Sequence, residues 1–327
     1  MLDNNSKSNI ENSTFTPPHQ LETAVLFLVF NRLDTTKQVF QAIREAKPPR
    51  LYIAADGARE SKEGEAEKVK AVRDYILQNI DWDCEVKTLF RENNLSCGPS
   101  VNGAISWFFE HEEMGIILED DTKPNISFFY YCEELLEMYK NDKRVGMISG
   151  NNHTSLIPLD SSYVFSKFFW TWGWATWRRC WKDMDFNLDW ERTEYSKSIV
   201  NNMGYTKKSV IYWEHNIEAI HNKKVNAWDY QWFLSLSSQN QLCIFPAFNL
   251  VSNVGFGEDA THTFGEAPEK YTNQKELIFP LRHPKYVLPL VDFENIYEKE
   301  NVKVQAGWKK LVPFSFKRII KKIIKYK

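Results

Sequence analysis

The stretch Gly115-Ile116-Ile117-Leu118-Glu119-Asp120-Asp121 places three acids directly after a short apolar run. Such a run is typical of a buried strand, and α/β sheets bind their ligands just outside the carboxyl ends of the strands. Three clustered carboxylates are unfavourable unless a cation neutralises them. Because Mg²⁺ and Mn²⁺ bind one or two carboxylates together with phosphate oxygens, the stretch predicts a metal site for a phosphorylated ligand. An acidic turn that caps the next helix is the alternative interpretation.

Strand and helix patterns alternate on both sides of this stretch. Helices are expected at 35–46, 62–78, 99–110 and 125–140 and around 226–232. Strands are expected at 24–30, 51–55, 85–90, 115–118, 145–149 and 242–245. This alternation predicts an α/β fold with a doubly wound, mostly parallel, Rossmann-like sheet.

The composition suits one large domain or one and a half, because 43% of the 327 residues are hydrophobic. The five cysteines form no C-x-x-C pair, so we expect reduced thiols in a cytoplasmic protein. No apolar run reaches the roughly 20 residues of a membrane-spanning helix. The first residues lack the basic start and apolar core of a signal peptide, so export is not expected.

Residues 301–327 differ in charge from the rest of the chain. They contain nine Lys or Arg and no acid. Since the formal net charge of the whole chain is −2, residues 1–300 carry a net charge of −11. Phe316, Ile319, Ile320, Ile323 and Ile324 fall on one helical stripe, and most of the nearby lysines fall outside it. This pattern favours an amphipathic helix on an anionic membrane. A helix docked on the protein itself and a nucleic-acid tail are the alternatives, and isoleucines favour lipid or protein over nucleic acid.

The segment 168–181 contains five tryptophans. Tryptophan faces can stack on the apolar C–H faces of sugar rings, and an indole N–H is costly to bury without a partner. A carbohydrate site and a tryptophan-rich subcore are both compatible with this segment. We expect Trp170 and Trp174 to lie nearest the site and the other tryptophans to be structural.

Several motifs, in order from about residue 23 to about residue 263, resemble the nucleotide-sugar glycosyltransferases of the GT-A fold. The resemblance is to their N-acetylglucosaminyltransferase I-like branch, which has a Glu-Asp-Asp signature. Strands that end in Asn31-Arg32 and Asp56-Gly57 precede Glu119-Asp120-Asp121, which an aromatic helix follows. Then come Gly173-Trp174, Trp228-Asp229 and the Gly-rich, His-bearing loop 255–262, in that order. The chain reads Trp-Asp-Tyr-Gln-Trp at 228–232, where relatives can show Trp-Asp-Asp-Trp.

The resemblance implies a nucleotide site around the first two strand ends. Asp56 would bind a uracil-like base, Asn31 and Arg32 would line the nucleotide pocket, and Arg32 would lie near the diphosphate. Asp120 would hold the ribose. Trp174 is counted with these donor-binding residues.

The same resemblance implies how the metal and the catalytic groups are arranged. Asp121 would bind Mn²⁺ or Mg²⁺, Glu119 would contact the donor sugar, and Asp229 would be the base of an inverting transfer. His262 would add a metal or phosphate contact. Independently, a glycosyl diphosphate needs cations to stabilise its leaving group, and an acceptor hydroxyl needs a carboxylate base on the opposite face of the sugar.

Structural interpretations stay open for several of these residues. Asp56-Gly57 is a common turn, Asp229 can be a salt-bridge partner, and His262 can be an ordinary loop histidine. His153, after another strand end, can approach the donor or the acceptor.

We divide the chain into a disordered N-terminus (1–20), a GT-A domain (21–265), a surface-wrapping extension (266–300) and a basic amphipathic tail (301–327). The predicted function is a metal-dependent, inverting hexosyl- or N-acetylhexosaminyltransferase of surface polysaccharide or lipopolysaccharide synthesis. It would use a UDP-sugar donor and a glycan or lipid-linked acceptor, and no nucleic acid. We expect it to be cytoplasmic and peripheral on the inner face of the plasma membrane. A non-catalytic carbohydrate-binding or membrane-surface protein is the alternative.

Overall fold

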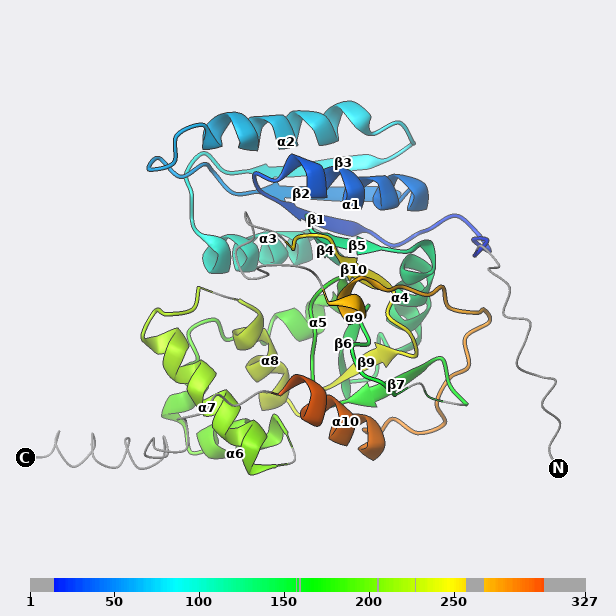
Figure 1. Ribbon diagram of the computed structural model, residues 1–327, viewed down its shortest axis with the longest axis vertical. Coiled ribbons are helices and arrows are strands. Elements are labelled where there is room, and N and C mark those ends of the chain that lie inside the picture. The colour runs from blue at the N-terminus through cyan, green and yellow to red at the C-terminus, as the bar shows by residue number, and fades with distance from the viewer. Residues whose placement is uncertain are drawn as a thin grey trace, which may run out of the picture.

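A computed structural model describes residues 15–156, 158, 160–204, 206–226, 228–256 and 268–302. Within these ranges the chain builds an eight-stranded sheet in the order β3-β2-β1-β4-β8-β6-β9-β7. Six strands run in one direction, and β8 and β7 run in the other. Helices pack on the sheet (Figure 1). The predicted doubly wound, mostly parallel α/β fold is therefore confirmed.

The strands of the large sheet are short and buried except at the β3 edge. They are β1 (Val25–Val29), β2 (Arg50–Ala55), β3 (Glu85–Phe90), β4 (Met114–Glu119), β6 (Val145–Ser149), β7 (Tyr163–Ser166), β8 (Trp174–Trp177) and β9 (Leu242–Pro246). A separate antiparallel pair consists of β5 (Thr122–Pro124) and β10 (Val251–Asn253).

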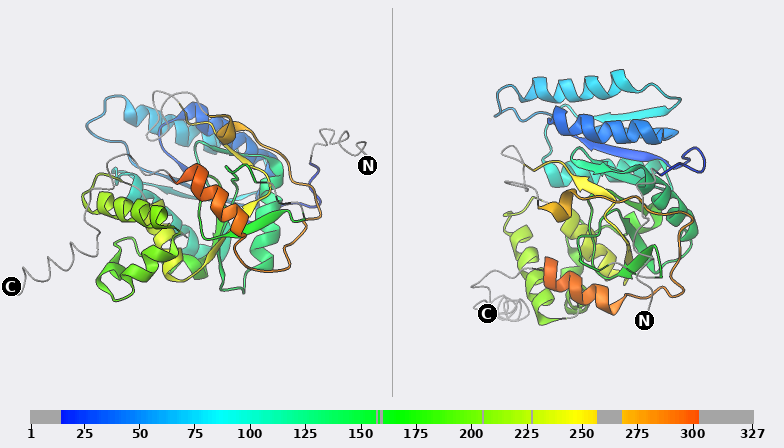
Figure 2. Two further views of the ribbon diagram at one scale, coloured as in Figure 1. Left: turned by 60° about the horizontal axis from the view of Figure 1, so that its bottom comes forward. Right: turned by 45° about the vertical axis from the view of Figure 1, so that its right-hand side comes forward.

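The longer helices connect strands of the sheet or belong to the carboxyl-terminal half of the chain. They are α1 (Leu33–Ala46), α2 (Glu65–Asn79), α3 (Cys97–His111), α4 (Ile126–Met138), α7 (Lys207–His221), α8 (Asp229–Ser238) and α10 (Val291–Asn301). The shorter ones are α5 (Arg178–Trp181), α6 (Ser196–Asn202), α9 (Glu269–Thr272) and a 3₁₀ helix at Asp189–Arg192. Figures 1 and 2 show α1 and α2 at one end of the molecule and α6, α7 and α10 at the other.

The strand order places a switch point between β1 and β4. The chain leaves β1 toward β2 and β3 on one side, and then returns to place β4 on the other side. The pairing of Leu28 with Glu119 aligns the carboxyl ends of β1 and β4. In open α/β sheets, ligands bind in the crevice outside such a switch point.

The small β5–β10 sheet brings a distant part of the chain to this crevice. Asn253 pairs with Thr122, and the Val254 N–H donates to the Asp121 carbonyl at 2.8 Å. Strand β10 (Val251–Asn253) was not among the strands expected from the sequence, and it leads directly into the loop predicted at 255–262. The pairing fixes the backbone that follows β10 beside Asp121.

The tryptophan-rich segment divides into a core part and a half-buried part. Trp174, Trp177 and Trp181 are buried in β8 and α5, and the Trp174 ring stacks on Trp228 at 5.5 Å. Trp170 and Trp172 remain half-buried. The prediction that Trp174 lies at a sugar site therefore needs correction, because its indole is 0% exposed and has no face to offer a ligand.

The two ends of the described chain also pack on the body. In the N-terminal segment expected to be disordered, the Phe15 ring lies 4.9 Å from Phe279. In the expected surface extension, α10 buries Phe293 and Tyr297, and the Tyr297 ring stacks on Phe168 at 4.4 Å. The C-terminal tail from residue 303 and His262 lie outside the described residues. Among the helices that the structure describes, none has the length and apolar character to cross a bilayer.

Candidate active site

The three acids of the predicted metal site lie at the switch point. Glu119 is the last residue of β4, and Asp120 and Asp121 form the turn into β5. The Thr122 hydroxyl donates to the Glu119 carbonyl at 3.1 Å and accepts from the Glu119 N–H at 2.9 Å. This local bonding fixes the turn that holds the acids together.

Arg32 crosses from the end of β1 to two of these acids. Its Nη2 donates to the Asp121 carboxylate at 2.9 Å and also to Asp120. Burial opposes the charge of Arg32, but Asp120 and Asp121 outweigh burial and raise the pKa of the guanidinium above its usual value. The sequence analysis places Arg32 near the diphosphate of a nucleotide, and that role stays a prediction.

One guanidinium does not neutralise the whole cluster. Burial, followed by the charges of Asp121, Asp229 and Asp120, raises the pKa of Glu119 well above its usual value. Burial, and after it the charge of Asp121, raises the pKa of Asp120 to about 6 in spite of Arg32. Asp229 is the first residue of α8, a position in which the helix dipole stabilises a negative charge. Burial and the neighbouring carboxylates therefore both favour the protonated form of Glu119.

The oxygens of the site fit a hard divalent cation only in part. Asp120 Oδ2 is buried and has no hydrogen-bond partner among the described residues, so it is available to a ligand. Those residues contain no group of three or more His, Cys, Asp or Glu placed to hold a metal ion. An ion held by Asp120 and Asp121 would complete its shell with ligand oxygens and water. This is the arrangement that Mg²⁺ prefers with phosphates.

Gly255 lets the chain after β10 pass directly over the ion pair. A Cβ at this position would lie 2.4 Å from Asp121 Oδ2 and 2.9 Å from Arg32 Nη1. The Gly255 N–H donates to the Asn253 side chain at 2.8 Å, which fixes the backbone at this approach. Any larger residue would have to displace the carboxylate or the guanidinium.

Asp56, the predicted base-binding residue, is occupied by the protein itself. It accepts from the N–H groups of Gly57 and Leu95, each at 3.0 Å, and from the Asn94 amide at 3.1 Å. It is buried, and a Cβ on Gly57 would collide with the backbone of Asn93 at 2.4 Å. In this conformation Asp56 organises the loop after β3. Its contact with a base stays a prediction.

Asn31 is also engaged. Its amide donates to Glu65 at 2.9 Å, and hydrogen bonds from Arg59 lower the pKa of Glu65 to about 2. Asn31 therefore faces an anionic residue at the start of α2. The sequence did not predict Glu65 or Arg59 as neighbours of the nucleotide site.

Cys97 at the start of α3 is a residue that the sequence analysis did not single out. It reaches solvent, yet desolvation of the thiol raises its pKa to about 12, helped by the charges of Glu119, Asp229 and Asp56. The N–H of the next residue donates to the Asn226 side chain at 3.1 Å, which ties the segment before α8 to α3. The signal available in the sequence was a helix start, Ser-Cys-Gly-Pro, after a predicted strand.

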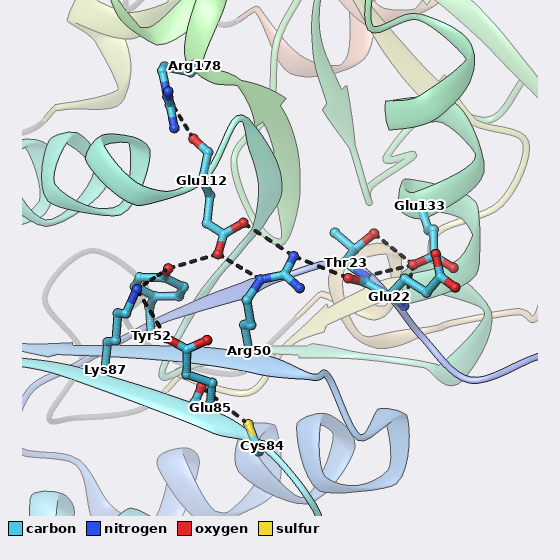
Figure 3. Close-up of polar contacts among 10 residues, drawn as sticks. All are labelled: Glu22, Thr23, Arg50, Tyr52, Cys84, Glu85, Lys87, Glu112, Glu133 and Arg178. Atoms are coloured by element: carbon cyan, nitrogen blue, oxygen red, sulfur yellow. Dashed lines mark hydrogen bonds and ion pairs between the residues drawn. The ribbon is translucent and has the colours of Figure 1, made fainter.

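A second charged network lies around Glu112, at the amino ends of β2 and β4, opposite the strand ends that carry the acids (Figure 3). Glu112 accepts from Arg50 Nε at 2.8 Å and from the Tyr52 hydroxyl at 2.8 Å. Nearby, Glu133 accepts from the Glu22 and Thr23 N–H groups at 2.7 and 2.8 Å. Each of these carboxylates accepts hydrogen bonds within the protein, and the second oxygen of Glu133, Oε1, lies 3.6 Å from His19 Nδ1. We therefore interpret this network as structural.

Comparisons with known proteins found similar solved structures but no matching family model and no curated relative. One similar solved structure is the mannosyltransferase PcManGT from Pyrobaculum calidifontis in complex with GDP-Man and Mn²⁺, with 13% identity and a TM-score of 0.32, over 50% of this chain and 46% of that one. Another is HddC from Yersinia pseudotuberculosis, with 10% identity and a TM-score of 0.31, over 52% of this chain and 86% of that one.

A third similar structure is TarS 1–349 from S. aureus, with 10% identity and a TM-score of 0.34, over 56% of this chain and 55% of that one. The match to the mannosyltransferase spans less than half of that protein's length. At these identities and TM-scores, the likenesses do not establish a shared family or activity. The functional argument therefore rests on the site.

Proposed function

We propose that the protein is a metal-dependent glycosyltransferase that moves a sugar from a nucleotide diphosphate to a hydroxyl group. One observation carries the proposal. Asp120 and Asp121 lie at the switch point and share the guanidinium of Arg32, and a buried carboxylate oxygen of Asp120 has no hydrogen-bond partner among the described residues. A buried acidic cluster that its own protein neutralises only in part is suited to a cationic ligand or a metal-phosphate group.

Each charged residue then has a separate role in transfer. Asp120 and Asp121 would hold the ion, whose charge stabilises the diphosphate as it leaves. Arg32 would move from the carboxylates to the phosphates and neutralise part of the same charge. Glu119, whose pKa is raised well above its usual value by burial and the neighbouring acids, would in its protonated form donate a hydrogen bond to a hydroxyl of the donor sugar.

Asp229 is the candidate for the base that takes the proton of the acceptor hydroxyl. It comes from α8 and the ion ligands come from the turn after β4, so base and leaving group are on different segments. A one-step inversion needs this separation, because the base and the diphosphate lie on opposite faces of the sugar. This arrangement supports an inverting rather than a retaining transfer.

The direct test is calorimetric binding of UDP with and without Mn²⁺, on the wild type and on Asp121→Ala. We expect binding that requires the metal and is lost in the variant, because Asp121 is a ligand of the ion. Asp81→Ala removes an exposed acid paired with Arg44 and serves as the matched control. UDP binding that is indifferent to metal and to Asp121 would contradict the proposal and would favour the carbohydrate-binding alternative.

The finer assignments belong to the same proposal. The donor is a UDP-sugar of the hexose or N-acetylhexosamine class, and the branch is the N-acetylglucosaminyltransferase I-like one. The acceptor is a glycan or lipid-linked glycan of surface polysaccharide synthesis. These assignments rest on the motif order in the sequence and are tested by measuring UDP release from a panel of UDP-sugars.

We further propose that residues 301–327 hold the protein on an anionic membrane at the cytoplasmic face. The proposal rests on the nine basic residues and the apolar stripe of this segment. A chain truncated after residue 310 should lose most of its partition onto vesicles that contain an anionic lipid. Unchanged partition would show that the tail has another role.

A further inference from the structure

His153 is a buried histidine whose ring nitrogens have no hydrogen-bond partner within the described ranges of the chain. It follows the carboxyl end of β6 and is 3% exposed, and neither nitrogen forms a hydrogen bond with the described residues. Burial, and then the charge of Lys270, lowers its pKa to about 3, so the ring is neutral at physiological pH. The neighbouring Trp170 Nε1 is also buried, with no hydrogen-bond partner among the residues that the structure describes. Because buried polar groups in proteins are normally hydrogen-bonded, such a cluster points to a ligand that supplies the partners.

Three aromatic rings surround this histidine. Its ring lies 4.8 Å from Trp170, 5.4 Å from Trp172 and 4.7 Å from Tyr271, in each case edge to face. Trp170, Trp172 and Tyr271 are all half-buried, so part of each remains available at the surface. We call these four residues the His153 box.

A cavity of about 360 Å³ lies against the box. Its polar lining includes Asn152, His153, Asn249, Lys270, Asn273 and Lys275. The Lys270 ammonium binds the Asn301 side chain at 3.0 Å, and the Lys275 ammonium lies 5.4 Å from the centre of the Phe248 ring. Among the described residues neither lysine has a carboxylate partner within ion-pair distance. The cavity therefore offers cations, amides and a neutral imidazole beside aromatic rings. It also contains one carboxylate, that of Glu300, which accepts hydrogen bonds from the Ser155 N–H and hydroxyl.

The box is continuous with the candidate active site. The Trp172 ring lies 6.4 Å from Phe256, which stacks on Tyr271 at 6.0 Å. Phe256 follows Gly255, the residue that passes over Asp121. Asn249 of the cavity lies just before β10, which runs toward the same acids. An extended molecule could therefore reach from the acids to the cavity along one aromatic surface.

We infer that the His153 box and its cavity bind an acidic sugar residue of the acceptor glycan, at a distance from the hydroxyl that receives the transferred sugar. Hydroxyl groups of this residue pair with His153 and the asparagine amides, its carboxylate pairs with Lys270 and Lys275, and its C–H faces contact the indoles. Such a subsite would make the enzyme recognise a charged oligosaccharide rather than a single sugar. The inference rests on the proposed glycosyltransferase function.

Ligand-observed saturation-transfer NMR tests the subsite with two matched probes, D-glucuronate and D-glucose. Both are pyranoses, and they differ in the carboxylate. We expect the wild type to bind glucuronate with a dissociation constant in the millimolar range and glucose about tenfold more weakly, because hydrogen bonds to charged groups are the stronger ones. His153→Phe, which keeps an aromatic ring, should abolish both signals. Lys270→Met with Lys275→Met should remove only the preference for glucuronate.

Controls separate loss of the subsite from loss of fold or of the donor site. The double lysine variant changes exposed side chains, so it reports on recognition even if His153→Phe does not fold. The Lys62→Met variant changes an exposed residue distant in sequence from the His153 box, and it should bind both sugars as the wild type does. Metal-dependent UDP binding is measured on the same samples, so that the proposed function can survive when the subsite fails. Equal binding of the two sugars, no binding of either, or binding unaffected by His153→Phe would overturn the inference.

Discussion

The acids at the switch point lie at the carboxyl ends of the strands, and the network around Glu112 lies at the amino ends. The two regions differ in how their charged groups are paired. Glu112 is bonded to a guanidinium and a hydroxyl, both within 2.8 Å. Asp120 and Asp121 share one guanidinium, and one oxygen of Asp120 has no hydrogen-bond partner in the described part of the chain. Burial, and after it the charge of Asp121, raises the pKa of Asp120 to about 6. A structural network satisfies its charges within the protein, whereas the switch-point acids would be satisfied by a ligand. On this comparison we expect the switch-point acids to serve ligand binding and the Glu112 network to serve stability.

The largest effect that would sharpen this comparison is expected for Asp229→Asn. Loss of a general base should lower the rate of UDP release from a UDP-sugar by roughly 10²–10⁴-fold. Metal-dependent UDP binding should stay unchanged, since the ion ligands are on another segment. Both quantities are measured on one preparation, by coupled assay and by calorimetry.

The control for this variant is Asp189→Asn, which removes an acid with a 62% exposed side chain. It should leave rate and binding as in the wild type. A wild-type rate in Asp229→Asn would remove Asp229 from the mechanism. A loss of UDP binding in that variant would instead move Asp229 into the donor site.

A smaller effect contrasts Asp120→Asn with Glu112→Gln in stability. Because the folded pKa of Asp120 is raised, its contribution to stability is present below the ordinary pKa of 3.8 and is lost as pH rises through about 6. At pH 7.5 its ionisation costs the folded state on the order of 3 kcal/mol, a net figure that already includes the favourable contacts with Arg32. Asp120→Asn should therefore keep or raise the free energy of unfolding, and should flatten its decline between pH 4 and pH 7.

Glu112→Gln should act in the opposite direction. It leaves the Arg50 guanidinium without its carboxylate and should lower the free energy of unfolding by about 1–3 kcal/mol, with UDP binding intact. Urea denaturation at several pH values measures both variants. The distinction between the switch-point acids and the Glu112 network would be wrong if Glu112→Gln abolished UDP binding. It would also be wrong if Asp120→Asn lowered the free energy of unfolding more than Glu112→Gln does.

The sequence predicted the first half of the sheet far better than the second. β1, β2 and β4 are short apolar runs between turn signals, which is how strands buried on both faces are recognised. β8 was missed because Trp174–Trp177 lies within a tryptophan-rich segment and pairs antiparallel between β4 and β6. Neither local pattern nor spacing reports such a long-range insertion.

The same limit explains what was predicted of the site. The acids and Arg32 follow strand ends, and the switch point brings strand ends together. The hydrogen bonds that occupy the Asp56 carboxylate come from Asn94 and Leu95, which lie in a different loop. The approach of Gly255 depends on the pairing of β10 with β5, two segments far apart in the sequence.

The smallest effect is expected for Gly255→Ala, which tests whether the Asp121 carboxylate must stay where Arg32 holds it. The added Cβ would lie 2.4 Å from Asp121 Oδ2, so the carboxylate or the loop must move. Overpacking of this kind typically costs about 1–3 kcal/mol, which corresponds to a roughly tenfold or greater loss of metal-dependent UDP affinity. Calorimetry measures the loss, and denaturation measures any change in stability.

Gly64→Ala gives the matched comparison. Gly64 has a φ of +73° and no neighbour within 4 Å of an added Cβ, so alanine there is strained but displaces nothing. It should lower the free energy of unfolding by about 1 kcal/mol and leave UDP binding unchanged. If Gly255→Ala instead bound UDP and Mn²⁺ as the wild type does, the position of the Asp121 carboxylate beside Arg32 would not matter for the donor. The unpartnered oxygen of Asp120 would then be the better candidate for the main metal contact.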